Sequence, residues 1–230
     1  MTEAQKARKS HAERREEAEA RIVEAARDLI SEKGTFAVTM ADIGIRAGYS
    51  RGLPYQRFGS KEGILEAVLQ SFIDRFNTRR DHVARPERGL DSITSLIETY
   101  FDRDPKDWKN AKALIIIMAE ASLHEGRLRD LVVQYNRKHI DYLKKHLAIA
   151  REQDQVSVDI DGESLAVIIM GTLRGVVLQS LSDQDIDLQK AKHRLLEIVF
   201  SLLGVPQEHR RETSRTVPVV CSSGDLSNSR

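Results

Sequence analysis

Residues 39–62 constrain the fold of this chain more than any other segment. Thr39 is placed to cap a short helix, Gly48 supplies a tight turn, Ser50 is placed to cap a second short helix, and Ser60 opens a third. Two short helices joined by a glycine turn are typical of a helix-turn-helix, whose second helix enters the major groove of DNA. The segment therefore predicts a DNA-reading unit.

The basic residues of the chain gather around this segment. The formal net charge is only +1, which by itself indicates no partner. Between residues 43 and 61, however, the charged residues are all cations: Arg46, Arg51, Arg57 and Lys61. Residues 6–15 carry further Lys and Arg against a single acid. Such clusters suit phosphate contacts, although the N-terminal run could equally be a solvated surface.

The composition favours a soluble, helix-rich protein. Of the 230 residues, 40% are apolar and 31% are charged, with only 13 Gly and 5 Pro, which is typical of helical domains. The N-terminus lacks the apolar region of a signal peptide, and no apolar run is long enough to span a bilayer, so we expect no membrane association. The lone cysteine, Cys221, excludes an intrachain disulfide and fits a reducing cytoplasm.

No catalytic or metal-binding pattern is recognisable. The sequence lacks G-x-S-x-G, a Walker-type glycine loop and H-E-x-x-H. His139 and His146 share a helical face, but no carboxylate completes a ligand set, so we interpret them as structural or exposed. We therefore expect no enzyme activity, no catalytic residue, no metal and no cofactor.

Caps, apolar stripes and breakers divide the chain into four parts. We expect a flexible basic arm at 1–9, a helix-turn-helix domain at 10–60, a helical ligand-binding and dimerisation domain at 61–204, and a disordered tail at 205–230. The sequence pattern also breaks at about residues 82–88, before Gly89, so the helix that starts near residue 60 could belong to both halves.

The first helix has clear start and stop signals. Ser10 with Glu13 fits a capping box, and Gly34 is placed to end the helix in a left-handed conformation. In the second half of the chain, apolar periodicity predicts five more helices, at about 90–103, 105–123, 125–153, 161–181 and 186–203.

Residues 21–69 resemble the DNA-binding region of the TetR/AcrR family of bacterial repressors. The matching residues lie in one register: Ala25, Ala26, Leu29, Gly34, Thr39, Ile43, Ala47, Gly48, Ser50, Gly52, Tyr55, Phe58, Ser60, Lys61, Glu62 and Leu65. The remaining two-thirds of the chain match only in the number and length of helices. The resemblance implies an all-α fold, with an N-terminal three-helix helix-turn-helix domain and a C-terminal helical bundle that binds ligand and dimerises.

The resemblance and the residue chemistry together predict the DNA contacts. Tyr55 resembles the family tyrosine that donates its hydroxyl to phosphate, with a core aromatic as the alternative. Arg51 and Gln56 suit guanine and adenine edges, although either could touch only phosphate. Gly52 would let the helix approach DNA closely, or would simply pack. The expected DNA-binding set is Thr39, Ser50, Arg51, Gly52, Tyr55, Gln56, Arg57 and Lys61.

Pro54 departs from the pattern. It lacks an N–H where the first full bond of a helix capped by Ser50 should form. We therefore expect the recognition helix to begin as a looser turn, which leaves open which face of residues 51–57 meets the bases.

Residues 161–181 predict a helix that is apolar nearly all round, and such a helix is typically buried on every side. In a terminal region this suggests burial against a second subunit, and the resemblance implies a four-helix interface. An ordinary intrachain bundle is the alternative. The expected interface residues are Leu165, Ile169, Val176, Leu195, Val199 and Leu202.

The other helices of the body could enclose a small-molecule site, although each candidate could equally be a core or surface residue. Arg174 is notable because a cation in an apolar helix needs an anionic partner, which could be Glu120, Asp141 or a ligand. The candidates are Tyr100, Trp108, Met118, Glu120, Tyr135, His139, Met170 and Arg174.

The sequence thus predicts a cytoplasmic, DNA-binding transcriptional regulator. We expect a homodimeric repressor that a small apolar or amphipathic effector releases from a palindromic double-stranded operator. One alternative is a dimeric DNA-binding protein that needs no ligand. The other is a helical protein-interaction module.

Overall fold

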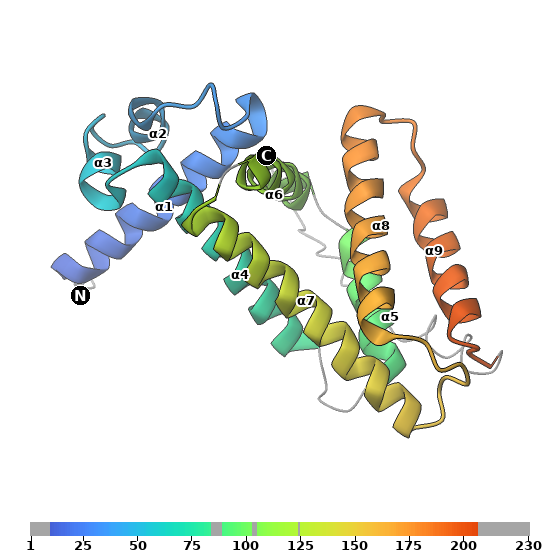
Figure 1. The fold of residues 1–230 in the computed structure, drawn as a ribbon. Helices are drawn as coiled ribbons and strands as arrows, with labels where there is room; N and C mark the ends of the chain where they lie inside the picture. Colours follow the sequence, from blue (N-terminus) through green and yellow to red (C-terminus); the bar gives the residue numbers. More distant parts are fainter. Residues whose placement is uncertain (1–9, 84–88, 103–104, 124, 207–230) are drawn as a thin grey trace, which may run out of the picture.

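The computed structural model describes residues 10–83, 89–102, 105–123 and 125–206, and these contain nine helices and no strand (Figure 1). The predicted all-α class is therefore confirmed. The predicted arm at 1–9 and residues 207–230 of the predicted tail lie outside the described residues. The helices are α1 (His11–Lys33), α2 (Met40–Arg46), α3 (Leu53–Phe58), α4 (Lys61–Val83), α5 (Gly89–Phe101), α6 (Pro105–Leu123), α7 (Arg127–Glu152), α8 (Gly162–Ser182) and α9 (Leu188–Leu202).

Three of the first four helices start where their side-chain caps predict. Ser10 forms a capping box with Glu13 at the start of α1, and Thr39 forms another with Asp42 at the start of α2. The Ser60 hydroxyl accepts a hydrogen bond of 3.1 Å from a backbone N–H in the first turn of α4. Each cap satisfies N–H groups that have no partner within the helix, so the polar sequence signals fix the helix starts.

The first hydrophobic core joins the helix-turn-helix region to the body. It contains buried side chains from α1, α2 and α4, together with side chains from α6 and the first half of α7. The α6 and α7 members are Ala113, Leu114, Ile117, Ala121, Leu128, Leu131, Val132 and Tyr135. We call α1 to α3 the reading head. It does not rest on a core of its own, because α6 and α7 complete that core.

The second hydrophobic core lies in the other half of the molecule. Buried side chains of α5, the second half of α7, α8 and α9 form most of it. In Figure 1, α8 and α9 stand at the end of the molecule opposite α2 and α3. The helices that could join two subunits are thus remote from the helix that could read DNA.

The α8 helix is apolar on more than its inward face. By length and composition alone it could cross a membrane. In the structure, Leu165, Ile169 and Leu173 on one face pack into the second core, whereas Ile168 and Leu178 on another face are exposed. A helix packed on one face and apolar on the opposite face is suited to a second protein surface.

Candidate DNA-binding surface

The recognition helix α3 begins later than Ser50 predicts. The helix spans Leu53–Phe58, no side chain caps it, and the Ser50 carbonyl accepts a turn hydrogen bond of 3.2 Å from the Leu53 N–H. The prediction that Ser50 caps this helix was therefore wrong. The cause is Pro54, whose missing N–H and fixed φ are tolerated only in the first helical turn. The helix start moves to Leu53, and Arg51 and Gly52 lie in the preceding turn.

The α2 helix packs so closely on this turn that only glycine fits at position 44. A Cβ atom on Gly44 would lie 2.5 Å from the Ser50 carbonyl oxygen and 3.2 Å from the Pro54 Cδ atom. The turn itself passes through Gly48 with φ 79°, a conformation that favours glycine. These two glycines set the position of α3 relative to α2.

One side of α3 faces inward and the other faces solvent. Pro54 is buried, and Leu53 and Phe58 pack against the first core. Tyr55 has an exposed fraction of 61%, so it is not the core aromatic that its type allowed. The exposed surface, which we call the reading surface, comprises Ser50, Arg51, Gly52, Tyr55, Gln56 and Arg57.

The polar side chains of the reading surface have no other role in the described part of the chain. The side chains of Arg51, Tyr55, Gln56 and Arg57 form no hydrogen bond or ion pair with another described residue. Their donors therefore remain available to an outside partner. An exposed set of guanidinium, amide and phenol groups on a short helix suits phosphates and base edges.

Thr39 and Lys61, which precede and follow the reading surface in the sequence, each form hydrogen bonds within the chain. The Thr39 hydroxyl accepts a hydrogen bond from the Asp42 N–H and donates one to the Asp42 carboxylate at 2.8 Å. The hydrogen bond that the Thr39 hydroxyl donates, together with one that the Thr39 backbone N–H donates at 3.2 Å, lowers the pKa of the Asp42 carboxyl below its ordinary value. The Lys61 ammonium donates to the Phe36 carbonyl oxygen at 3.4 Å and ties the start of α4 to the loop before α2. Phosphate contacts by either residue remain predictions.

Two contacts that hold the reading head together were not visible in the sequence. Arg46 forms a two-point ion pair with Glu32 of α1, at 3.0 and 2.9 Å, so it anchors α2 rather than remaining free for phosphate. The Arg21 guanidinium of α1 lies 5.3 Å from the centre of the Tyr49 ring, in the turn before α3. Both pairs join residues that lie far apart in the sequence, so local sequence spacing gives no signal for them.

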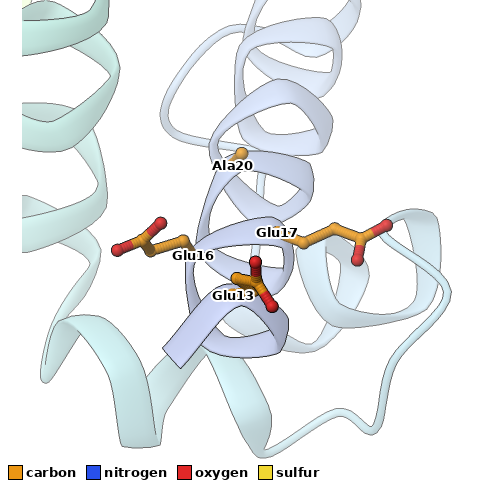
Figure 2. Close-up of a pocket in the computed structure, with 4 residues that line it drawn as sticks. All are labelled: Glu13, Glu16, Glu17 and Ala20. Atoms are coloured by element: carbon orange, nitrogen blue, oxygen red, sulfur yellow. The ribbon is translucent and has the colours of Figure 1, made fainter. Parts of the chain in front are cut away.

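The surface depression at the start of α1 does not form a binding site. It is lined by Glu13, Glu16, Glu17 and Ala20. Figure 2 shows the Glu16 and Glu17 carboxylates pointing to opposite sides of the helix. The carboxylates therefore do not converge on a ligand, and no group of three metal-binding side chains occurs among the described residues.

Comparison with known proteins places this geometry in a family. The family model for bacterial regulatory proteins, tetR family, matches residues 22–68, which hold the reading surface. The chain belongs to the TetR family. It is 29% identical over 171 residues to the transcriptional regulator BetI of Rhizobium meliloti (strain 1021), covering 73% of this chain and 80% of the relative. TetR-family proteins are DNA-binding transcriptional regulators rather than enzymes.

Solved structures share the fold of this TetR-family chain. A transcriptional regulator from Saccharomonospora viridis in complex with choline aligns with a TM-score of 0.72 at 20% identity, covering 81% of this chain and 96% of that one. AibR in complex with isovaleryl coenzyme A and operator DNA aligns with a TM-score of 0.64 at 18% identity, covering 82% and 100%. At these identities the matches establish the architecture.

The candidate effector residues of this TetR-family regulator do not form one group. Glu120 accepts a hydrogen bond of 2.7 Å from the Thr35 hydroxyl, so it joins α6 to the loop after α1. Met118 packs against the first core, whereas Tyr100 is buried in the second and Trp108 packs against it. The remaining four candidates come from α7 and α8, and some of them contact one another: Tyr135, His139, Met170 and Arg174.

Tyr135 lies against both His139 and Arg174. The Tyr135 and His139 rings are tilted with centres 4.4 Å apart, and the Arg174 guanidinium lies 5.7 Å from the centre of the Tyr135 ring. His139 is buried and its Nδ1 atom lies 2.9 Å from the Tyr135 carbonyl oxygen. Met170 lies one turn before Arg174 on α8 and is buried in the second core. The sequence pattern made these residues candidates but gave no sign that any of them touch.

Most of the predicted interface residues of this TetR-family chain are not accessible to a second subunit. Leu165, Ile169, Leu195 and Val199 are buried in the second core of the chain itself, and Val176 packs against that core. Only Leu202 among the six is exposed. Because α8 is apolar all round, periodicity could not tell its inward face from its outward face. The exposed apolar surface, which we call the outer face, comprises Val167, Ile168, Leu178, Ile198 and Leu202.

The buried His139 predicts a loss of stability in mild acid. Burial, with a smaller contribution from the charge of Arg174, lowers its pKa from 6.5 to about 4. As the pH falls from 6.5 towards 4, His139 therefore becomes protonated in the unfolded chain but stays neutral in the folded chain. We expect this group to remove about 2 kcal/mol of unfolding free energy between pH 7 and pH 5.

Urea unfolding at the two pH values measures this effect. The His139→Phe variant keeps an aromatic ring beside Tyr135 but cannot titrate, so its stability should fall less than that of the wild type over the same interval. Val133→Phe adds an aromatic ring at an exposed, non-titrating position of the same helix, so it is the control and should leave the pH dependence unchanged. An equal pH dependence in wild type and His139→Phe would show that His139 is not the responsible group.

Proposed function

We propose that this TetR-family regulator is a homodimeric, cytoplasmic repressor that binds a palindromic operator and leaves it when a small molecule occupies the body. The observation that carries the proposal is the reading surface on α3. Arg51, Tyr55, Gln56 and Arg57 are exposed there, and none of their side chains forms a hydrogen bond or ion pair with another described residue. In this proposal α3 lies in the major groove, with Thr39 and Lys61 beside the phosphates on either side of it.

The outer face supports dimerisation. Val167, Ile168 and Leu178 of α8 and Ile198 and Leu202 of α9 expose apolar side chains at the end of the chain remote from α3 (Figure 1). A Cβ atom added to Gly171 or Gly175 of α8 would have no atom within 4 Å, so a second helix has room to approach. A two-fold axis through this face would pair α8 and α9 of both subunits and place two reading surfaces on one duplex.

The shared first core supports coupling between the body and the reading head. Side chains of α6 and α7 pack with α1, α2 and α4, and the Thr35 to Glu120 hydrogen bond of 2.7 Å adds a polar link. Displacement of α6 or α7 by an effector would therefore displace α1 and the helices it carries. Couplings of this kind are typically worth about 1–3 kcal/mol, or roughly 5-fold to 150-fold in operator affinity.

The family relatives support a small-molecule signal without agreeing on its chemistry. The structure from Saccharomonospora viridis holds choline, and AibR holds isovaleryl coenzyme A together with operator DNA. A quaternary ammonium and an acyl thioester have little in common. The class of effector for this chain must therefore come from its own residues.

Operator binding tests the docking of α3. Duplexes selected from a random pool with the purified protein supply the operator, and fluorescence anisotropy at several salt concentrations gives the affinity. Tyr55→Phe should weaken binding about tenfold, because each subunit loses one phosphate hydrogen bond. Lys61→Ala should weaken binding to all sequences and reduce the salt slope by about one per subunit.

The matched control is Lys190→Ala, which removes the same charge from an exposed position on α9. It should leave both affinity and salt slope unchanged. If Tyr55→Phe and Lys61→Ala both bind the operator as the wild type does, α3 does not dock as proposed.

A further inference from the structure

The α8 helix carries an isolated charge whose donors lack acceptors. Arg174 is the only charged residue between Ser164 and Ser182. Its Nε and Nη2 atoms are inaccessible to solvent and form no hydrogen bond within the described part of the chain. Guanidinium donors that are buried without acceptors are costly, because their lost water contacts are not replaced. The arrangement therefore favours an acceptor from outside the chain.

The acids that could have paired with Arg174 are engaged or turned away. Glu120, near the C-terminal end of α6, accepts a hydrogen bond from the Thr35 hydroxyl. Glu163, on the same helix, pairs with Arg137 and Lys144 at 2.7 and 3.0 Å. Asp141 is exposed and forms no ion pair with Arg174. The described acids thus leave the guanidinium uncompensated.

The two vacant donors form one edge of the guanidinium plane. The N–H bonds of Nε and Nη2 run nearly parallel on the side of the group away from its Cδ atom. This edge matches the two oxygens of a carboxylate, which can accept both bonds at once. A neutral ligand with a single carbonyl would satisfy one donor and leave the other empty.

The surroundings of Arg174 suit an anion with an apolar body. The Tyr135 ring lies on one side of the guanidinium, and the buried Met170 lies one helical turn away. His139 is neutral at pH 7 because burial lowers its pKa to about 4, so Arg174 is the positive charge of this cluster. A cationic ligand would be repelled there, and a carboxylate would be attracted.

We propose that Arg174 is the anchor for the carboxylate group of a small amphipathic effector, held between α7 and α8. This inference rests on the proposed function and names the class of its effector. Tyr135 belongs to the first core, which also holds the reading head, whereas Met170 belongs to the second. An anion bound at Arg174 therefore touches both cores and can shift one against the other.

Matched ligands test the charge requirement directly. The probes are butanoate, octanoate and benzoate, each paired with its primary amide, together with octyltrimethylammonium. Binding is measured by thermal unfolding and by the fluorescence of Trp108, the one tryptophan of the chain, which packs against the second core. At least one carboxylate should bind wild type about 10-fold to 100-fold more tightly than its amide, as expected for charge-assisted bonds. The same carboxylate should release operator DNA.

Variants locate the anchor. Arg174→Met keeps length and removes the charge, so it should fold at least as stably as wild type, bind the operator and lose the preference for carboxylate. Arg174→Lys keeps the charge without the parallel donors and should bind carboxylate with intermediate affinity. Arg137→Met removes an exposed arginine from the adjacent helix and should retain full carboxylate binding.

Each contrary outcome has a distinct meaning. Equal binding of amides or of the ammonium ion, or full carboxylate binding by Arg174→Met, overturns the anchor. Loss of the dimer in Arg174→Met would show that an acid of a second copy pairs with Arg174, which also overturns it. If wild type binds its operator but no carboxylate, the anchor is wrong and the repressor function stands. If carboxylate binds but no operator does, the anchor stands and the repressor function fails.

Discussion

Replacing Leu178 by glutamate is expected to split the dimer and to lower operator affinity about 1000-fold. Leu178 is 51% exposed on the outer face of α8, the helix in which Gly171 and Gly175 leave room for a second helix. In a two-fold interface each substitution occurs twice, so two carboxylates would enter an apolar contact without partners. A monomer binds one half-site only. It therefore lacks the increase in affinity from binding two half-sites at once, which is typically about 100-fold to 10,000-fold.

Analytical ultracentrifugation and operator anisotropy measure the two consequences separately. Val133→Glu is the matched control, because Val133 is an exposed valine on α7 outside the outer face. It should remain dimeric and bind the operator. A Leu178→Glu protein that stays dimeric with unchanged affinity would show that the subunits meet through another surface.

The second large effect is expected at Gly44, where alanine should abolish specific operator binding while leaving most of the chain folded. The new Cβ would lie 2.5 Å from the Ser50 carbonyl oxygen, a backbone atom that cannot rotate away. The turn before α3 must therefore move, and α3 moves with it. Overpacking of this kind costs about 1–3 kcal/mol of stability, whereas an error of about 1 Å in the position of α3 removes base contacts altogether.

Gly52→Ala is the matched comparison for Gly44→Ala. A Cβ on Gly52 meets no atom within 4 Å, and its φ of −88° is accessible to alanine, so folding should be unaffected. Circular dichroism and urea unfolding measure the structure and stability of both variants, and anisotropy measures operator binding. Normal operator affinity in Gly44→Ala would contradict the role assigned to the α2–α3 contact. Reduced affinity in a stable Gly52→Ala would show that this glycine allows close approach to DNA.

Local signals predicted the helices well because the relevant interactions are local. Ser10 with Glu13, and Thr39 with Asp42, act within one helical turn, so the sequence contains both partners at fixed spacing. Ser50 failed as a cap because a competing local signal, Pro54, moved the start of α3. The sequence contained that signal, and the looser turn predicted from Pro54 is present at Arg51 and Gly52.

The features that sequence did not predict depend on contacts between distant helices. The Arg46 to Glu32 pair and the Thr35 to Glu120 hydrogen bond join residues whose proximity only the fold decides. The sequence could not show which face of α8 packs inward for a related reason. Leucine, isoleucine and valine occur on both of its faces, so the hydrophobic pattern carries no direction, and only packing against α5 and α7 separates Leu165 from Leu178.

The completion of the first core by α6 and α7 limits how such a regulator can be recombined. A hybrid made by transplanting residues 10–60 onto a foreign body would leave Ile22 and Ile30 facing side chains selected for another neighbour. A working hybrid must therefore carry Ile117 and Leu131 with the transplanted segment, or redesign the contact between α1 and the helices α6 and α7. The same packing constraint applies to engineered hybrids that join a new effector-binding body to an existing reading head, and to natural recombination between related regulators.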